Sequence, residues 1–366
     1  MSTLLLLAGT KKGVFIGRAD AASRGAGAWR FSGPHCSGTW SFCDVRYDEA
    51  SGVIYGGGQS NWYGAAVWRS ADLGETWTHS SEGLVYADGP GIEQVWCVRP
   101  VGDALYAGVD PAGLFKSVDG GRTWAEVESV RRHDTSGEWR GTNGGLPLSA
   151  ILPPAHDGRL DGSVGRTADE GKGIEERPDD ALWVAISAGG VYRSADSGRT
   201  WERLPMAGDP CVHALVQAAG GALYQQNHAG VWRSDDGGTS WTDASSGLPS
   251  KFGFPLVAHP RAASTVYAVP LQSAMEGERH VSDERMAVWR TRDGGGSWHA
   301  LTTGLPDGRT YLTVLRGALA VDGLEPAGVY AGTPTGQLFG SADEGDSWFE
   351  VTRGLPPIYS VSCAVV

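Results

Sequence analysis

Short stretches in which apolar and polar residues alternate recur along the whole chain. Six of them end in a Ser or Thr, and they read AAVWRS, AGLFKS, GGVYRS, AGVWRS, MAVWRT and GQLFGS. A second alternating stretch lies upstream of each, for example GVIYGGG or DALYAGV, and a third lies further upstream, for example DVRYD or HALVQ. Alternation with a period of two residues is typical of half-buried β-strands. The pattern therefore predicts three strands in each repeat before the Ser or Thr.

An eight-residue motif, Ser/Thr-x-Asp-x-Gly-x-Thr/Ser-Trp, begins at that Ser or Thr. The six copies start at Ser70, Ser117, Ser194, Ser234, Thr291 and Ser341. An Asp carboxylate at the third position can accept hydrogen bonds from the following backbone N–H groups, and the Gly tolerates a positive φ in a tight loop. The closing Trp begins a fourth strand and offers a large apolar surface. We interpret the motif as a clamp on a hairpin, because a catalytic carboxylate is not needed six times.

These repeats predict an all-β fold, a seven-bladed β-propeller of four-stranded antiparallel blades with strands A to D. Six blades carry the clamp, and the ends of the chain supply the seventh. TLLLLAGTKKGVFIGRAD matches strands B and C, AWRFSG matches strand D with Trp29 in place of the motif Trp, and the C-terminal VSCAVV matches strand A. The C-terminal strand would then join the N-terminal strands and close the ring, leaving no exposed sheet edge. We expect residues 1–366 to form this single domain.

Three insertions interrupt the period. Residues 128–144 form a long D-to-A loop and residues 271–285 form a B-to-C loop, so both are expected on the face that carries the mouth of the central channel. Residues 155–180 lie in an A-to-B loop on the other face. They are rich in Gly and charged residues without apolar periodicity, which predicts disorder.

Composition and charge narrow the possible functions. The net charge of −12, without a run of Lys or Arg, argues against a nucleic-acid partner. The apolar run at Leu4 is too short for a signal sequence or a membrane span. Five Cys residues, an odd number without framework spacing, suggest reduced thiols. We therefore expect a cytoplasmic protein with no membrane partner, and its oligomeric state stays open.

Strand A is the innermost strand of a propeller blade, so its equivalent residues should converge at the channel. Aligning strand A across the blades places seven residues at one level: Asp44, Cys97, Ser149, His213, Phe254, Gly317 and Cys363. In one interpretation, His213, Asp44 and Cys97 form a catalytic acid/base set, or a single divalent metal binds to Asp44, Cys97, His213 and Cys363. In the other, the cysteines are ordinary buried residues and the histidine is hydrogen-bonded across the channel. No other cofactor is expected.

Polar and aromatic residues gather on the predicted rim of the channel. The candidates for ligand binding are Trp62, Tyr63, Glu93, Trp96, Arg140, Gln226, Asn227, His228 and Tyr311. Aromatic rings among amides and carboxylates suit a sugar or a planar small molecule, although they also suit a plug for the wide end of the channel. Glycoside hydrolysis needs two carboxylates roughly 5 to 10 Å apart, and Asp44, Glu93 and Asp209 are the rim acids that we nominate.

The six clamps resemble the Asp-box (BNR) repeats of the bacterial sialidase-like superfamily, whose members are commonly labelled glycosyl hydrolases. The same box occurs in sialidases, xyloglucanases, sortilin-type receptors and photosystem assembly factors, so the resemblance implies a fold and not one function. A true sialidase is expected to carry Arg-Ile-Pro near its start, and this chain does not. We expect a hydrolase- or lyase-like enzyme that acts on a polar or aromatic metabolite or a glycoside at the channel mouth. The alternative is a non-catalytic scaffold for a protein or glycan partner.

Overall fold

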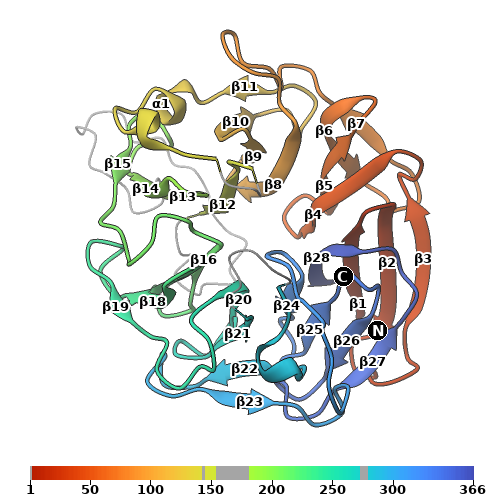
Figure 1. The fold of residues 1–366 in the computed structure, drawn as a ribbon. Coiled ribbons are helices and arrows are strands. Elements are labelled where there is room, and N and C mark those ends of the chain that lie inside the picture. The colour runs from red at the N-terminus through yellow and green to blue at the C-terminus, as the bar shows by residue number, and fades with distance from the viewer. Residues whose placement is uncertain (1, 142–144, 154–180, 273–278) are drawn as a thin grey trace, which may run out of the picture.

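Seven sheets form a ring around a central channel in the computed structural model, which describes residues 2–141, 145–153, 181–272 and 279–366 (Figure 1). Each sheet has four strands, and each strand runs antiparallel to its neighbours. The predicted seven-bladed propeller is therefore confirmed. The predicted disordered segment, residues 155–180, lies outside the described residues.

The blades follow one another in chain order. Blade 1 consists of β28 (Ile358–Val365), β1 (Thr3–Thr10), β2 (Gly13–Asp20) and β3 (Arg30–His35). Blade 2 consists of β4 (Trp40–Asp48), β5 (Val53–Ser60), β6 (Gly64–Ser70) and β7 (Thr78–Ser80). Blade 3 consists of β8 (Gln94–Val101), β9 (Ala104–Asp110), β10 (Gly113–Ser117) and β11 (Ala125–Glu126). Blade 4 consists of β12 (Leu148–Leu152), β13 (Leu182–Ile186), β14 (Gly190–Ser194) and β15 (Glu202–Arg203).

The remaining three blades complete the ring. Blade 5 consists of β16 (Ala214–Gln217), β17 (Leu223–Asn227), β18 (Gly230–Ser234) and β19 (Thr242–Asp243). Blade 6 consists of β20 (Gly253–Ala258), β21 (Val266–Pro270), β22 (Val288–Thr291) and β23 (His299–Leu301). Blade 7 consists of β24 (Leu319–Val321), β25 (Val329–Gly332), β26 (Leu338–Ser341) and β27 (Phe349–Thr352).

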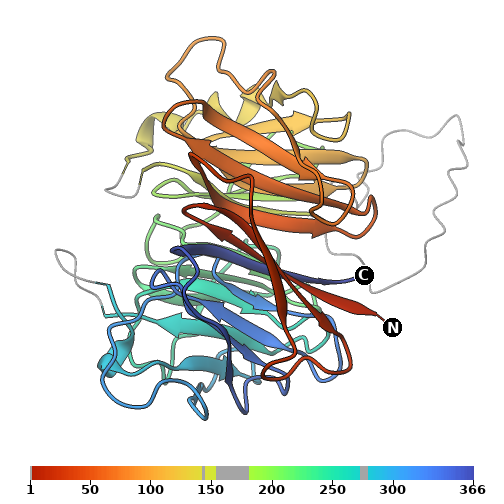
Figure 2. The same ribbon diagram turned by 90° about the vertical axis from the view of Figure 1, so that its right-hand side faces the viewer.

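The last strand of the chain closes the ring, as predicted. β28 pairs with β1 in continuous register from Leu4 opposite Val365 to Leu7 opposite Ser362. Thr3, the first residue of β1, and Val366, just after β28, exchange two backbone hydrogen bonds of 2.8 Å. The two termini consequently lie close together on one face of the ring (Figure 2). The apolar run at the start of the chain is a core strand, since the side chains from Leu4 to Leu7 are fully buried.

The predicted clamp is present in the hairpin between the third and fourth strands of six blades. In blade 2 the Asp72 carboxylate accepts hydrogen bonds from the Ser70 hydroxyl (2.7 Å), from the Thr76 N–H (2.9 Å) and from the Thr76 hydroxyl (2.5 Å). The Ser70 hydroxyl in turn accepts the Gly74 N–H at 2.8 Å. The same bonds recur around the motif carboxylates of the other five copies, Asp119, Asp196, Asp236, Asp293 and Asp343.

The hydrophobic core lies in layers between neighbouring blades. One layer joins Tyr55 and Val67 of blade 2 to Val98 and Phe115 of blade 3, and it includes the motif residue Trp124. Burying a side chain such as Phe115, which is fully inaccessible, contributes about 1.5–3 kcal/mol. Each blade therefore buries its apolar side chains only when the neighbouring blades are in place. The position of every inner strand consequently depends on an intact ring.

Short helices occupy the described parts of the first and third insertions. The first contains α1 (Glu128–Arg131) and η1 (Ser136–Glu138), and its residues 142–144 lie outside the described part of the chain. The third contains η3 (Ser282–Glu284), and its residues 273–278 are likewise not described. In the described ranges, no helix has the length and apolar character needed to cross a membrane.

We predict that deleting residues 360–366 abolishes cooperative folding, because the inner edge of β1 then loses most of its partner strand. Circular dichroism melting of the truncated chain should show no sharp transition. Adding a synthetic peptide of residues 357–366 should restore one, since it can occupy the vacant edge. A truncated chain that melts like the full-length protein would contradict closure by β28.

We predict that the Asp72 clamp stabilises the protein at neutral pH and loses this effect in acid. Hydrogen bonds from Thr76 and Ser70 lower the pKa of Asp72 to about 2, whereas an unfolded Asp titrates near 3.9. The stabilisation is therefore complete above about pH 4 and disappears as the pH falls towards 2. Melting temperatures between pH 7 and pH 2 should show a deficit for Asp72→Asn that narrows in acid. Asp103→Asn, at an exposed turn, is the control and should follow the wild type.

Candidate functional site

Two cavities lie in the central channel, and the side chains of the inner strands line both. The first cavity, which we call the upper cavity, has a volume of about 520 Å³. Its lining residues are Lys11, Thr39, Ser41, Cys43, Gln59, Asn61, Gln94, Trp96, Phe254, Arg279, Leu315, Arg316, Gly317 and Tyr359. The lower cavity has a volume of about 350 Å³. Four residues border both cavities: Cys43, Trp96, Arg316 and Gly317. These four residues therefore mark the boundary between the two halves of the channel.

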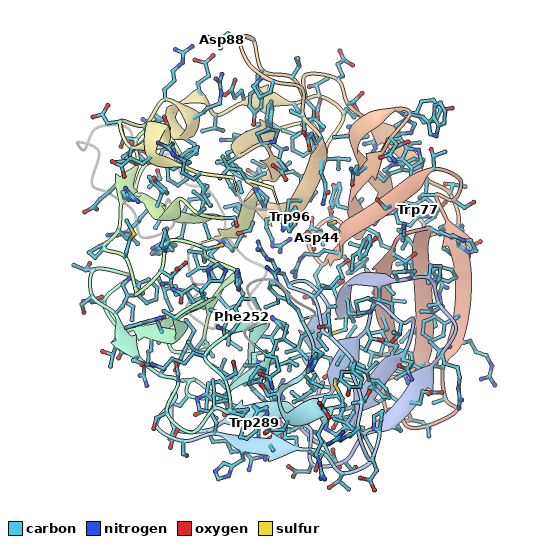
Figure 3. The ribbon with its side chains drawn as sticks, viewed as in Figure 1. Asp44, Trp77, Asp88, Trp96, Phe252 and Trp289 are labelled. Atoms are coloured by element: carbon cyan, nitrogen blue, oxygen red, sulfur yellow. The ribbon has the colours of Figure 1, made fainter. Side chains whose placement is uncertain are left out.

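The residues aligned on strand A face this channel. The structure places six of the seven on the wall of the lower cavity: Asp44, Cys97, Ser149, His213, Gly317 and Cys363. Phe254 lines the upper cavity instead. In Figure 3, Asp44, Trp96 and Phe252 surround the centre of the ring, whereas Trp77, Asp88 and Trp289 lie towards its periphery.

Asp44 forms an ion-paired link between two blades and does not pair with His213. Its Oδ1 accepts a hydrogen bond from Arg46 Nε at 3.0 Å, and its Oδ2 accepts the Val98 N–H at 2.9 Å and a guanidinium N–H of Arg99. Burial alone would raise the pKa of Asp44, but the charges of Arg99 and Arg46 lower it overall. The expected acid/base partnership of Asp44 with His213 is therefore wrong, because both carboxylate oxygens are already engaged between β4 and β8.

His213 is a buried, neutral imidazole directly before β16. Its Nδ1–H donates a 2.7 Å hydrogen bond to the Gly253 carbonyl of blade 6, which leaves Nε2 with its lone pair. The ring packs against Phe252 and Phe254, with centroid distances of 5.3 and 5.0 Å. Burial and the nearby Arg316 charge lower the pKa of His213 to about 2. A group with such a pKa does not take up a proton near neutral pH, so the expected proton transfer does not fit. Its neutral Nε2 can instead donate a lone pair to a hydrogen-bond donor or a metal ion.

The described residues bring His213 together with Cys211 and His228, not with the other predicted metal ligands. One ligand atom from each of the three residues lies within 4.8 Å of the other two. Cys97 instead lies with its Sγ 3.7 Å from the Leu148 carbonyl, and burial raises its pKa to about 11. The predicted metal set of Asp44, Cys97, His213 and Cys363 does not form such a cluster among the described residues. Cys211, His213 and His228 belong to one blade, whereas the predicted residues come from four separate blades.

Hydrogen bonds and charges around Cys211 favour its thiolate. Burial would raise the pKa of Cys211, but His228, Ser187 and Arg316 lower it overall. The pKa of His228 is raised, chiefly through its hydrogen bond with Cys211. The other side of His228 faces Asp209, with Nδ1 and Oδ1 3.5 Å apart, and Asp209 also accepts the Cys211 N–H at 2.8 Å. Cys211 was missed in the sequence because it lies outside the aligned strand positions, although the spacing Cys-x-His was visible.

Arg316 is a further residue that the sequence did not single out. Its guanidinium lies over Trp96 and Phe254, 5.6 Å from each ring centroid. Burial lowers its pKa, and the Cys211 sulfur counteracts that effect. Among the described residues, no group accepts a hydrogen bond from its buried Nη1. A buried donor without a protein partner costs free energy unless water or a ligand accepts the bond, so Arg316 is suited to hold an anion.

The other predicted ligand residues divide into three groups: those buried in the protein, one that lines the cavities, and those exposed outside the cavities. Gln226 and Asn227 are buried, and their amides donate to backbone carbonyls, including Lys251 O at 2.8 Å and Asp209 O at 3.1 Å. Both residues therefore brace loops and are not free to contact a ligand, which corrects that expectation. Trp96 is the member of the predicted set that borders the cavities.

The third group lies outside both cavity walls. The side chains of Trp62, Tyr63 and Tyr311 are 80%, 73% and 59% exposed. Glu93 is exposed as well. Arg140 is also exposed and donates to the carbonyls of Gly137 and Trp139 in its own loop.

The described lining of the upper cavity carries positive charge, although the protein is acidic overall. Lys11, Arg279 and Arg316 are the charged residues on its wall, and no carboxylate is found among its described lining residues. Arg279 lies over Phe252 and Phe254 at 5.4 and 5.2 Å. The nearby Asp110 carboxyl has a pKa raised by burial, and Leu146 N–H donates to it at 3.1 Å. The wall thus combines positive charge, aromatic surface and amide groups.

Comparisons with known proteins agree with this architecture. A probable oligoxyloglucan-reducing end-specific xyloglucanase of Neosartorya fischeri is 25% identical over 252 residues, which cover 54% of this chain and 29% of that protein. The chain therefore spans under a third of the length of the curated xyloglucanases that it matches. A GH74 xyloglucanase of Xanthomonas campestris superposes with a TM-score of 0.62 at 19% identity, covering 96% of this chain and 53% of that one. These likenesses show a shared propeller fold.

A propeller solved with a bound peptide also has a similar fold. The structure of YCF48 bound to D1 peptide superposes with a TM-score of 0.55 at 15% identity, covering 85% of this chain and 81% of that one. The model of the DUF6242 beta propeller domain matches residues 172–364, more than half of the chain. The chain belongs to the DUF6242 β-propeller domain family.

Proposed function

We propose that the protein is a hydrolase-like enzyme of the Asp-box propeller superfamily that binds an anionic small molecule in the upper cavity. One observation carries the proposal. Three cationic side chains, Lys11, Arg279 and Arg316, line a cavity of about 520 Å³ without an acidic residue among the described lining, in a chain of net charge −12. A ligand pocket of this size accommodates a metabolite or a monosaccharide derivative.

The remaining lining residues suit a ligand that carries hydroxyls or a ring beside its negative charge. Gln59, Asn61 and Gln94 provide amide donors and acceptors. Trp96 and Tyr359 provide flat apolar surfaces against which a sugar or a planar ring can stack. An Arg guanidinium recognises carboxylate or phosphate through two parallel hydrogen bonds. The proposed ligand is therefore a sugar acid, a phosphorylated sugar or an aromatic carboxylate.

The chemistry of a paired-carboxylate glycosidase has little support at this site. Such enzymes need two carboxylates flanking the scissile bond. Of the acids nominated from sequence, Asp44 is held by two arginines, and neither Glu93 nor Asp209 borders the described cavity walls. His213 borders the lower cavity, and it lies together with Cys211 and His228. A hydrolytic activity would then rely on these side chains.

A second candidate function is a rim that binds a protein or glycan partner. It is supported by the adjacent Trp62 and Tyr63 in the β5–β6 turn, which are 80% and 73% exposed. The peptide-bound YCF48 structure has a related fold. We also propose a cytoplasmic location, which is consistent with all five cysteines being free thiols.

We predict that calorimetric titration detects binding of anionic ligands and not of their neutral counterparts. The panel pairs glucuronate with glucose, glucose 6-phosphate with glucose, and benzoate with benzyl alcohol. Arg279→Met should weaken binding at least tenfold, about 1.4 kcal/mol, because it removes a cation from the cavity wall. Arg140→Met is the matched control, since Arg140 is exposed outside both cavities, and it should bind like the wild type.

Two results would contradict this proposal. Equal binding of the anionic and neutral ligands would show that positive charge does not drive binding. Unaltered affinity of Arg279→Met would show that the ligand does not bind in the upper cavity. Binding that survives Arg279→Met but is lost in Trp62→Ala would favour the rim as the functional surface.

A further inference from the structure

Cys211, His213 and His228 converge although they come from two separate segments of blade 5. Cys211 and His213 lie in the segment that enters β16, and His228 lies in the turn between β17 and β18. One ligand atom from each residue lies within 4.8 Å of the other two. Cys211 and His213 are buried, with 4% and 3% exposure, and His228 is partly exposed. Sulfur and imidazole nitrogen are the donors that zinc prefers in proteins.

Each of the three side chains is held by a second group. The Nδ1–H of His213 donates to the Gly253 carbonyl at 2.7 Å, so its Nε2 lone pair is available. His228 Nδ1 lies 3.5 Å from Asp209 Oδ1, and that carboxylate is anchored by the Cys211 N–H at 2.8 Å. The Ser187 hydroxyl lies 3.5 Å from Cys211 Sγ. A carbonyl or carboxylate behind a histidine is the usual support of a metal-binding imidazole, because it fixes the tautomer and the ring orientation.

We propose that Cys211, His213 and His228 bind a divalent transition metal, with zinc the best match to the donors. Three protein ligands leave one position of a tetrahedral zinc ion open, the arrangement found in catalytic zinc sites. His213 borders the lower cavity, and Arg316 borders both cavities and interacts electrostatically with Cys211 and His213. This site stands on its own geometry and does not require the proposed ligand of the upper cavity.

The same residues allow one competing arrangement. Cys211, His228 and Asp209 also follow the order of a nucleophilic thiol, an imidazole base and an orienting carboxylate. That arrangement uses His228 but leaves the inward Nε2 of the buried His213 without a role. The metal accounts for all three side chains and for the hydrogen bond behind His213. A test must therefore separate a metal ligand from a reactive thiol.

Titration of the full-length, chelator-treated protein with Co²⁺ tests the metal site. We expect one equivalent to bind and to produce the near-ultraviolet absorption of a cobalt–thiolate bond, and Zn²⁺ should displace it. Cys211→Ser should abolish that absorption, and His228→Gln should weaken Co²⁺ binding at least tenfold. Cys97→Ser is the matched control, because Cys97 is a buried channel thiol outside the cluster, and it should retain the wild-type spectrum.

Alkylation by iodoacetamide supplies a second readout that does not need a folded variant. Zn²⁺ should slow the modification of Cys211 at least tenfold in the wild-type protein, since a coordinated thiolate is shielded. The proposal is overturned if the wild type shows no cobalt–thiolate absorption, or if Cys97→Ser removes it as Cys211→Ser does. Rapid alkylation of Cys211 at the same rate with and without Zn²⁺ would also overturn it and would favour the nucleophilic thiol.

Discussion

The pairing of β28 with β1 is the constraint on which the rest of this structure depends. The first sheet has four strands only because the far end of the chain supplies its inner strand, which covers the edge of β1. Closure also brings the ends of the chain to one site, because Lys11 and Tyr359 line the same cavity. The apolar layers between blades then hold every inner strand at a fixed distance from the channel axis.

The distribution of charge follows from this closed architecture. The chain is acidic overall, yet arginines gather along the channel, where Asp44 joins Arg46 and Arg99 across two blades and Arg316 lies between the two cavities. Cavities walled by apolar rings focus the field of a few cations, because such walls have a low dielectric constant. An acidic protein can therefore present an electropositive mouth to a small anion. Hydrogen bonds with His228 and Ser187, together with the charge of Arg316, lower the pKa of Cys211 despite its burial.

The candidate site was only partly predictable from the sequence. Alignment of strand A placed His213 at the channel, and the structure also has it on a cavity wall there, since equivalent positions of a repeat face the channel together. The alignment also grouped His213 with Asp44, whose oxygens are in fact occupied by Arg46 and Arg99. It missed Cys211, which lies two residues before His213 and outside the strand, and it missed Arg316. Comparison of equivalent positions cannot reveal neighbours that a loop brings together.

The sequence by itself determined the number of blades, their four strands, the clamps and the closure of the ring. The strands and clamps arise from interactions that are local or repeated: the period-two alternation of a strand, and hydrogen bonds within the few residues around Asp72. Closure joins the two ends of the chain, and it was predicted because those ends carry the strands that complete the seventh repeat. The tertiary structure alone decided which side chains meet at the channel. Cys211 contacts His228, and Arg316 interacts with Cys211, only because the loops and neighbouring sheets place them there. Those contacts join residues that are separated in the sequence, and no local sequence pattern indicates that they lie close together in space.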